Sequence, residues 1–171
     1  MRDDYQLRQL RRELRKSLPQ RSDDLDALPR IVALGYPAVE PILFDLLKWI
    51  RQPDWPVATP VAAFLTQIGT PLMPYIEQMF RSHDQAWAAQ VIRHILEHWP
   101  AEALLPLVGW LDQQAIHAHW GYDLEALSLL VRKRLLTREY ARELLQTKRY
   151  FLEKQLSQVE SIEALLSNQA G

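Results

Sequence analysis

The feature that most constrains the fold is a turn motif that occurs twice, at Gly35 and again 34 residues later at Gly69. The copies read L-G-Y-P-A-V-E-P-I-L from Leu34 and I-G-T-P-L-M-P-Y-I from Ile68. A glycine just after a helix adopts the positive φ that other residues avoid, and a proline in the first helical turn forfeits no hydrogen bond. Each copy therefore predicts a helix end, a tight turn and a helix start, with positive φ at both glycines. A weaker third copy, W-P-A-E-A-L-L-P-L, begins at Trp99.

Apolar residues recur at helical spacing along nearly the whole chain, and no segment alternates with a period of two. We therefore predict an all-α protein. The expected helices span residues 4–18, 23–34, 38–51, 56–68, 71–81, 84–98, 101–112, 122–136, 138–146 and 148–167. The candidate N-caps are Ser22, Asp54, Asp84, Asp123 and Thr137. The stretch 113–121 is expected to be the loosest segment.

A period of roughly 30–45 residues built from two helices is typical of an α-solenoid. The run G-x-P-A-V-E-P-I-L-x-x-L-L resembles the opening of the second helix of HEAT repeats. With D-W-P-V-A-T-P at 54–60, residues 24–112 also resemble an uncharacterised bacterial family of small HEAT-like proteins. This resemblance implies a right-handed superhelix of antiparallel helix pairs, and it implies no activity or site residues.

The predicted organisation is a single domain, 1–171, with three parts. A basic N-terminal helix lies in 1–22, HEAT-like repeats occupy 23–112, and a helical cap follows in 121–171. A cap is expected because the last repeat of a solenoid would otherwise expose its apolar face.

Composition excludes several kinds of chemistry. The 171 residues include no cysteine, so a disulfide framework, a thiolate metal site and a cysteine nucleophile are excluded. Five glycines form no phosphate-binding loop, and the serines assemble no nucleophilic triad. The first residues form no apolar signal segment, and no apolar run is long enough for a membrane span. We therefore expect a cytoplasmic protein without membrane contact.

Charge is distributed unevenly along the chain. Residues 1–22 hold seven Lys/Arg and three Asp/Glu, whereas residues 23–112 hold five and eleven. The acidic middle argues against nucleic acid as a partner, because a phosphate track needs continuous positive charge. The basic face of the first helix is expected to be a solvated surface, and the alternatives are a contact with an acidic partner or with the chain's own acidic middle.

His94, Glu97 and His98 spell H-x-x-E-H, the motif of inverted zinc peptidases, in which two histidines bind zinc and the glutamate is the general base. The context is unfavourable, since Trp99-Pro100 ends the helix directly after His98. His117 and His119 offer a second weak H-x-H pair. The prediction is that no metal, cofactor or catalytic residue is required, with His94, Glu97 and His98 as the candidate ligands if that prediction fails.

Six tryptophans are a high count for this length, at positions 49, 55, 87, 99, 110 and 120. Packing between neighbouring repeats is expected for most of them, and exposure for one or two. Tryptophan and tyrosine are frequent anchors of protein interfaces. Tyr36, Trp55 and Trp87 are the candidate partner contacts, and Trp55 is the best candidate for exposure.

Three classes of function remain open. The favoured class is a non-enzymatic helical-repeat module that binds another protein through its concave face, with a bacterial adaptor or immunity role as an analogy. The second class is an enzyme, such as a HEAT-like DNA glycosylase, which needs a basic groove with a carboxylate among aromatic residues. The third class is a self-assembling structural subunit.

The segment 148–167 carries a narrow apolar seam formed by Leu152, Leu156, Val159, Ile162 and Leu166. A seam this narrow is typical of a coiled-coil contact. The favoured prediction is that this helix folds back to cap the last repeat, which leaves the chain a monomer. The alternative is a homodimer in which the helix pairs with its equivalent in a second chain.

Overall fold

The structure, a computed structural model, describes residues 2–117 and 122–169. Within these ranges the regular elements are all helical, as the sequence predicts. The α-helices are α1 (Arg2–Arg15), α2 (Leu28–Leu34), α3 (Leu43–Leu47), α4 (Ala58–Ile68), α5 (Met73–Phe80), α6 (Gln85–His94), α7 (Ala101–Leu104), α8 (Val108–His117), α9 (Tyr122–Arg132) and α10 (Arg138–Gln169). The 3₁₀ helices are η1 (Leu25–Ala27), η2 (Glu40–Ile42), η3 (Lys48–Ile50), η4 (Thr70–Leu72), η5 (Leu96–His98) and η6 (Leu105–Leu107).

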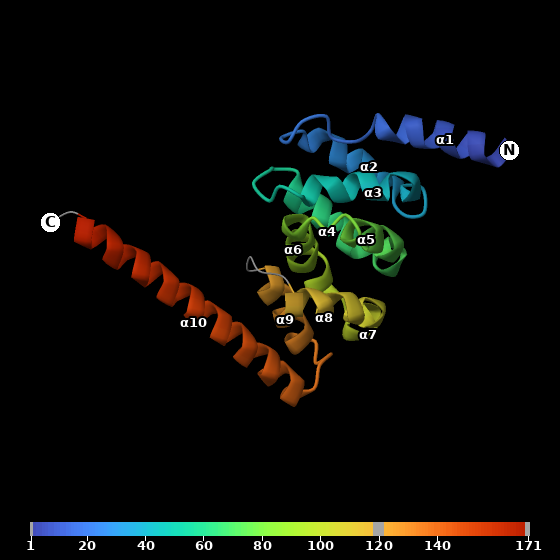
Figure 1. The fold of residues 1–171 in the computed structure, drawn as a ribbon. Coiled ribbons are helices and arrows are strands. Elements are labelled where there is room, and N and C mark those ends of the chain that lie inside the picture. The colour runs from blue at the N-terminus through green and yellow to red at the C-terminus, as the bar shows by residue number, and fades with distance from the viewer. Residues whose placement is uncertain (1, 118–121, 170–171) are drawn as a thin grey trace.

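The helices α1 to α9 are stacked in chain order, with α1 at one end and α7, α8 and α9 at the other (Figure 1). Contacts join near neighbours in the chain, including α3 with α4, α4 with α6, and α8 with α9. The helix α10 starts at the α9 end and extends away from the stack (Figure 1). No helix in 2–117 or 122–169 has both the length and the apolar character needed to cross a membrane.

The two turn glycines have the positive φ that the sequence predicts. Gly35 follows α2 with φ 61° and ψ 178°, and Gly69 follows α4 with φ 72° and ψ −142°. An extended ψ combined with a positive φ is accessible almost only to glycine. A Cβ at position 69 would meet no neighbouring atom within 4 Å, so backbone strain and not crowding requires the glycine there.

Prolines divide two of the predicted helices into shorter pieces. The predicted helix 38–51 is a series of η2, α3 and η3, and the predicted helix 101–112 begins as α7 and η6. Pro41 and Pro106 lie in the first turns of η2 and η6. Proline lacks the N–H group that continues an α-helix and clashes with the preceding turn, so the chain restarts at each of these points.

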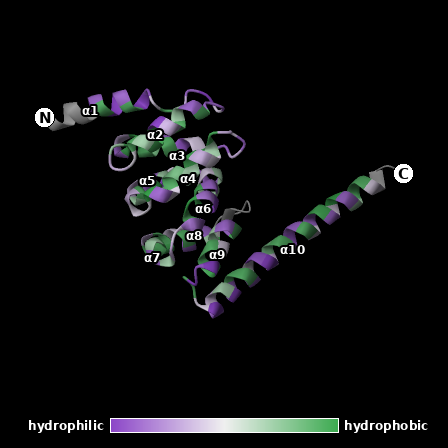
Figure 2. Cartoon of the chain, turned by 180° about the vertical axis from the view of Figure 1, so that it is seen from behind, coloured by the Kyte–Doolittle hydropathy of each residue, from purple (hydrophilic) through white to green (hydrophobic). Residues whose placement is uncertain are grey.

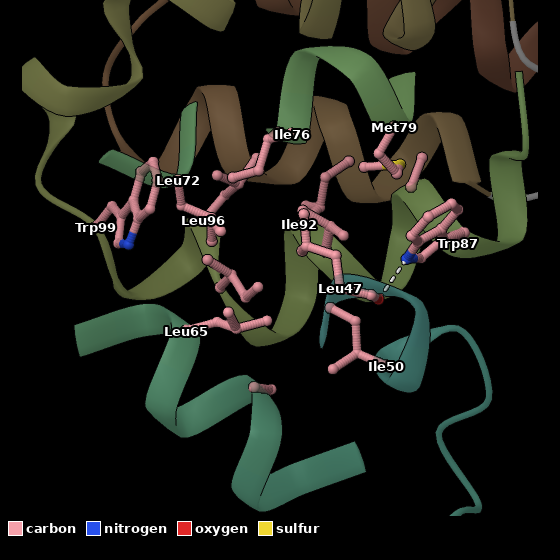
Figure 3. Close-up of a cluster of buried hydrophobic side chains, with 14 of the residues drawn as sticks. Leu47, Ile50, Leu65, Leu72, Ile76, Met79, Trp87, Ile92, Leu96 and Trp99 are labelled. Atoms are coloured by element: carbon pink, nitrogen blue, oxygen red, sulfur yellow. Dashed lines mark hydrogen bonds between the residues drawn. The ribbon is translucent and has the colours of Figure 1, made fainter. Parts of the chain in front are cut away.

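The core is one continuous cluster of side chains from α2 to α9, joined by Leu144 of α10. Figure 3 shows its centre, where Leu47 and Ile50 meet Leu65, Ile92 and Leu96. Many of these side chains have no solvent-accessible surface. Neighbouring helices therefore share one apolar interior along the stack.

The prediction that 113–121 is loose is wrong for its first half. Helix α8 continues through His117, and Ala115 is buried against the core. Ala115 lies four residues after the buried Leu111, so one helical face continues into the segment. Residues 118–121 lie outside the described residues.

The predicted helices 138–146 and 148–167 are a single helix, α10. No glycine or proline separates them, and nothing else interrupts the backbone hydrogen bonds. Thr137 is the N-cap, as predicted: its Oγ1 accepts a hydrogen bond of 3.2 Å from the Tyr140 N–H.

Only the beginning of α10 covers the end of the stack. Ala141 and Leu144 are buried, whereas the large apolar side chains from Tyr150 to Leu166 are 51–62% exposed. Bands of hydrophobic and hydrophilic residues alternate along this free part of the helix (Figure 2). The predicted cap 121–171 is thus wrong for residues 149–167: α9 and the first turns of α10 cover the end of the stack.

Candidate functional site

The best candidate site begins with the attachment of α1 to α3. Asp45 of α3 is buried, and its Oδ2 accepts a hydrogen bond of 2.8 Å from Arg15 Nε. Its Oδ1 accepts bonds from an Arg15 guanidinium nitrogen at 3.1 Å and from Lys48 Nζ at 3.0 Å. A guanidinium nitrogen of Arg11 lies 3.4 Å from Oδ2. One carboxylate therefore joins two turns of α1 to the stack.

This environment keeps Asp45 ionised. Burial acts to raise the pKa of Asp45, but the hydrogen bonds and charges of Arg15 and Lys48 outweigh it and lower the pKa to about 2. The same pairing raises the pKa of Arg15. Since cations occupy both oxygens, Asp45 acts as a structural anchor at neutral pH.

A cleft of 530 Å³ opens beside this anchor, between the end of α1 and η3. We call it the aromatic cleft, and its lining consists of Arg15, Leu18, Pro19, Gln20, Asp45, Lys48, Trp49, Arg51, Trp55 and Trp87. The rings of Trp49 and Trp55 lie 5.4 Å apart between centroids. Arg51 at its edge pairs with Asp84 at 2.6 Å. The cleft thus combines an aromatic wall with a charged rim.

A second cleft, of 590 Å³, lies further along α1, where residues of η2, α3 and α5 form its other walls. We call it the basic cleft, and its lining consists of Arg8, Arg11, Glu40, Pro41, Phe44, Tyr75 and Gln78. The Phe44 ring lies 5.8 Å from the Trp87 ring of the aromatic cleft, so the two clefts are close neighbours. Together they have five cationic and two carboxylate side chains in their linings. The α1–α3 groove, our name for both clefts together, therefore has more cationic than carboxylate side chains in its lining, and three of the cations come from α1.

The three candidate partner contacts have different positions. Trp55 is 37% exposed at the rim of the aromatic cleft, as predicted. Tyr36 is 46% exposed in the turn after α2 and lies near enough to Tyr75 to affect its ionisation.

The prediction that Trp87 contacts a partner at the surface is wrong, because this residue is only 6% exposed. Its indole N–H donates a hydrogen bond of 2.9 Å to the Leu47 carbonyl, which Figure 3 shows across the core. This bond satisfies the polar end of the ring, so Trp87 forms the floor of the cleft and packs in the interior.

The other described tryptophans mostly pack, as predicted. Trp99 is buried and donates to the Thr66 carbonyl at 3.3 Å. The Trp110 ring stacks on Phe80. Trp120 lies outside the described residues.

The histidine motif is not arranged as a metal site. His94 ends α6, and a kink at Ile95 separates it from Glu97 and His98 in η5. The Glu97 carboxylate binds the Arg132 guanidinium at 2.8 Å. Burial, together with the neighbouring Arg93 and His98, lowers the pKa of His94. Across residues 2–117 and 122–169 no cluster of three or more His, Asp or Glu side chains could hold a metal ion.

The second candidate pair, His117 and His119, lies outside the described side chains.

Sequence reasoning left open a contact between the basic first helix and the acidic middle of the chain, but it did not identify Asp45 as the residue that makes it. The available signal was a lone acidic residue inside the apolar run P-I-L-F-D-L-L, together with arginines three and four residues apart at 8, 11 and 15. That spacing places the three arginines on one face of a helix, where they can meet a single buried carboxylate.

A protein-family model described as a domain of unknown function, DUF5071, matches residues 17–130. The match begins just after α1 and ends within α9, so it covers α2 to α8 and most of α9 and excludes both α1 and α10. No curated protein and no solved structure matches the chain.

Proposed function

The chain belongs to the DUF5071 family, and we propose that its stacked helices form a non-enzymatic, HEAT-like α-solenoid that binds a protein partner. The repeated glycine–proline turn and the packing of each helix on its neighbours in the chain support this architecture. The proposed binding surface is the α1–α3 groove. It replaces the concave face expected from the sequence, to which no particular groove had been assigned.

The observation that carries the proposal is the combination of aromatic and cationic side chains in one groove. Trp49 and Trp55 offer a ring surface beside Lys48 and Arg51. Interface hot spots are enriched in tryptophan and arginine, and they lie in pockets from which water is excluded. The partner that fits is an acidic protein segment whose apolar side chain enters the aromatic cleft.

The hydrogen bonds and the ionised state of Asp45 favour a binding function over a catalytic one. A general acid or base must be free to exchange a proton with a substrate. The carboxylate of Asp45 accepts bonds from Arg15 and Lys48, and its pKa of about 2 leaves it without a proton at neutral pH. Its role in this proposal is to fix α1 as one wall of the groove.

The test begins with partners captured by the full-length chain and identified by cross-linking, followed by titration of the purified partner. Trp55→Ala should weaken binding at least tenfold, since truncation of a hot-spot residue costs about 2 kcal/mol or more. Leu105→Ala, at an exposed position of η6 outside the groove, is the matched control and should leave the affinity unchanged. A partner that binds both variants like the wild type would reject the groove as its site.

A DNA glycosylase is the second candidate, because one specific observation favours it. A carboxylate, Asp45, lies in a cleft with Trp49, Trp87 and several cations, which is the arrangement such an enzyme needs. Fluorescence anisotropy with damaged and undamaged duplexes tests DNA binding, and a base-release assay tests activity. Base release by the wild type that is lost in Asp45→Asn would replace the protein-binding proposal with this one.

A further inference from the structure

The free part of α10, residues 149–166, has more exposed large apolar side chains than any other described element, and we call it the α10 arm. Eight large apolar side chains lie on it, each 51–62% exposed: Tyr150, Phe151, Leu152, Leu156, Val159, Ile162, Leu165 and Leu166. At 1.5 Å per residue the arm is about 27 Å long. Contiguous exposed apolar surface of this kind marks an interaction site.

The apolar positions of α10 follow a heptad. Leu145, Leu152, Val159 and Leu166 are each seven residues apart, and Leu156 lies between two of them at the spacing of the second core position. A seven-residue repeat with two core positions is the pattern by which one helix packs along another. The arm is therefore suited to a helical partner of similar length.

The chain's own body does not provide that partner. α10 runs from Arg138 to Gln169 without a glycine or proline, so it has no point at which to turn back. Its first turns are fixed to the stack by Lys148 Nζ, 2.6 Å from Asp123 Oδ2, and by the Tyr140 hydroxyl, 3.2 Å from Asp112 Oδ2. These contacts direct the arm away from the stack (Figure 2).

The charges of the arm identify the partner. Arg149 and Glu163 occupy core-type heptad positions, seven residues before and seven after Leu156. In a parallel pair of identical helices each would face its own copy, which places like charges together. In an antiparallel pair the two kinds of core position face each other, so Leu156 lies beside Val159 of the other helix, and Arg149 lies within one turn of the other Glu163.

The net charges of the two halves of the arm also favour an antiparallel pair. Residues 149–157 hold Arg149, Glu153 and Lys154, net +1, and residues 158–166 hold Glu160 and Glu163, net −2. We propose that the α10 arm binds the α10 arm of a second copy of this chain as an antiparallel coiled coil. The two stacks then lie at opposite ends of the pair, and each keeps its own α1–α3 groove.

Sedimentation of the full-length chain tests the association. The expected species has twice the chain mass of 20.0 kDa. Leu156→Glu with Val159→Glu should weaken dimerisation at least tenfold and yield the monomer. Ser157→Glu with Ser161→Glu adds the same charge outside the seam and should leave the dimer intact. A wild-type monomer at tens of micromolar, or a dimer that survives the seam variant, would overturn the proposal.

Introduced thiols test the orientation, because the natural chain has no cysteine. Leu156→Cys and Val159→Cys are made in separate chains, which keeps Arg149 and Glu163 in place. When the two variants are mixed and mildly oxidised, the main product should join position 156 of one copy to position 159 of the other, identified by peptide mapping. Disulfides of 156 with 156 or of 159 with 159 as the main products would overturn the antiparallel arrangement.

Discussion

The first and last helices of this chain are both amphipathic, yet they are attached to the stack in opposite ways. α1 is held by its second half, where Arg11 and Arg15 bind Asp45 and Leu14 packs against the core. α10 is held by its first turns, and its apolar seam remains exposed. A leucine seam alone therefore does not determine what a helix packs against. The position of a buried carboxylate on the stack, Asp45 for α1 and Asp123 for α10, determines which part of each helix is attached.

Deleting α10 should give the largest effect of the changes considered. Removal of everything from Arg138 onward uncovers the surface beneath Leu144 and leaves the buried Asp123 without its lysine. The expected loss in the free energy of unfolding is more than about 4 kcal/mol. Removal from Tyr150 onward leaves these contacts in place and should change the unfolding of the monomer by less than about 1 kcal/mol. Urea denaturation of both truncations measures the difference, and equal losses would mean that the arm packs on the stack.

Lys148→Met removes the ion pair that fixes α10, together with the hydrogen bond of 3.2 Å from Lys148 Nζ to the Ile116 carbonyl. Both partners are nearly buried, so the substitution leaves the Asp123 carboxylate without its cation. We expect a loss of about 3 kcal/mol, because an unpaired buried charge costs more than the pair itself contributes. Lys148→Met combined with Asp123→Leu should recover most of the loss in the same denaturation assay. A double variant as unstable as the single one would mean that the cost comes from packing.

Asp45→Asn is the equivalent test for α1, and it should lower the free energy of unfolding by about 1–2 kcal/mol. This loss is smaller than the one expected for the α10 ion pair, because water can solvate Arg11, Arg15 and Lys48 once the carboxylate is removed. The pKa of Asp45 is lowered in the folded state from 3.8 to about 2. Its stabilisation is therefore complete above about pH 4 and is lost as the pH falls toward 2. Denaturation at several pH values should show the wild type and the variant converging over that window. A constant difference down to pH 2 would exclude the carboxylate as the cause.

Leu10→Ala should have the smallest effect, within about 0.5 kcal/mol, because the Leu10 side chain is half exposed although it belongs to the leucine stripe of α1. Leu14→Ala, four residues later and packed against the core, is the matched substitution and should cost about 1 kcal/mol or more. Thermal denaturation of the two variants compares two successive turns in the second half of α1. Equal losses would show that the exposed Leu10 contributes as much to stability as the packed Leu14.

Much of the fold could be predicted from the sequence because its signals are local. The positive φ at Gly35 and Gly69, and the N-caps Asp84 and Thr137, each depend on a few neighbouring residues. The all-helical class follows from periodicity, which is also a property of neighbours. Trp55 next to a proline at a helix start gave a correct expectation of exposure for the same reason.

The missed features depend on residues far apart in the chain. The burial of Trp87 is completed by a hydrogen bond to Leu47, 40 residues earlier. The α1–α3 groove exists because Asp45 binds Arg15, 30 residues earlier. The continuity of α10 was missed although its signal is local: residues 138–146 and 148–167 were expected as separate helices, yet no glycine or proline lies between them.

The Asp45 anchor also sets an order of events during synthesis. Arg11 and Arg15 leave the ribosome before the carboxylate that holds them, and Asp45 follows Arg15 by 30 residues. At about 5–20 residues per second, α1 spends seconds as a cationic helix without its docking site. For α10 the order is reversed, because Asp123 and the residues of α8 and α9 are synthesised before Lys148. The nascent α1 is thus exposed to anionic surfaces such as ribosomal RNA, whereas the start of α10 emerges next to the surface on which it docks.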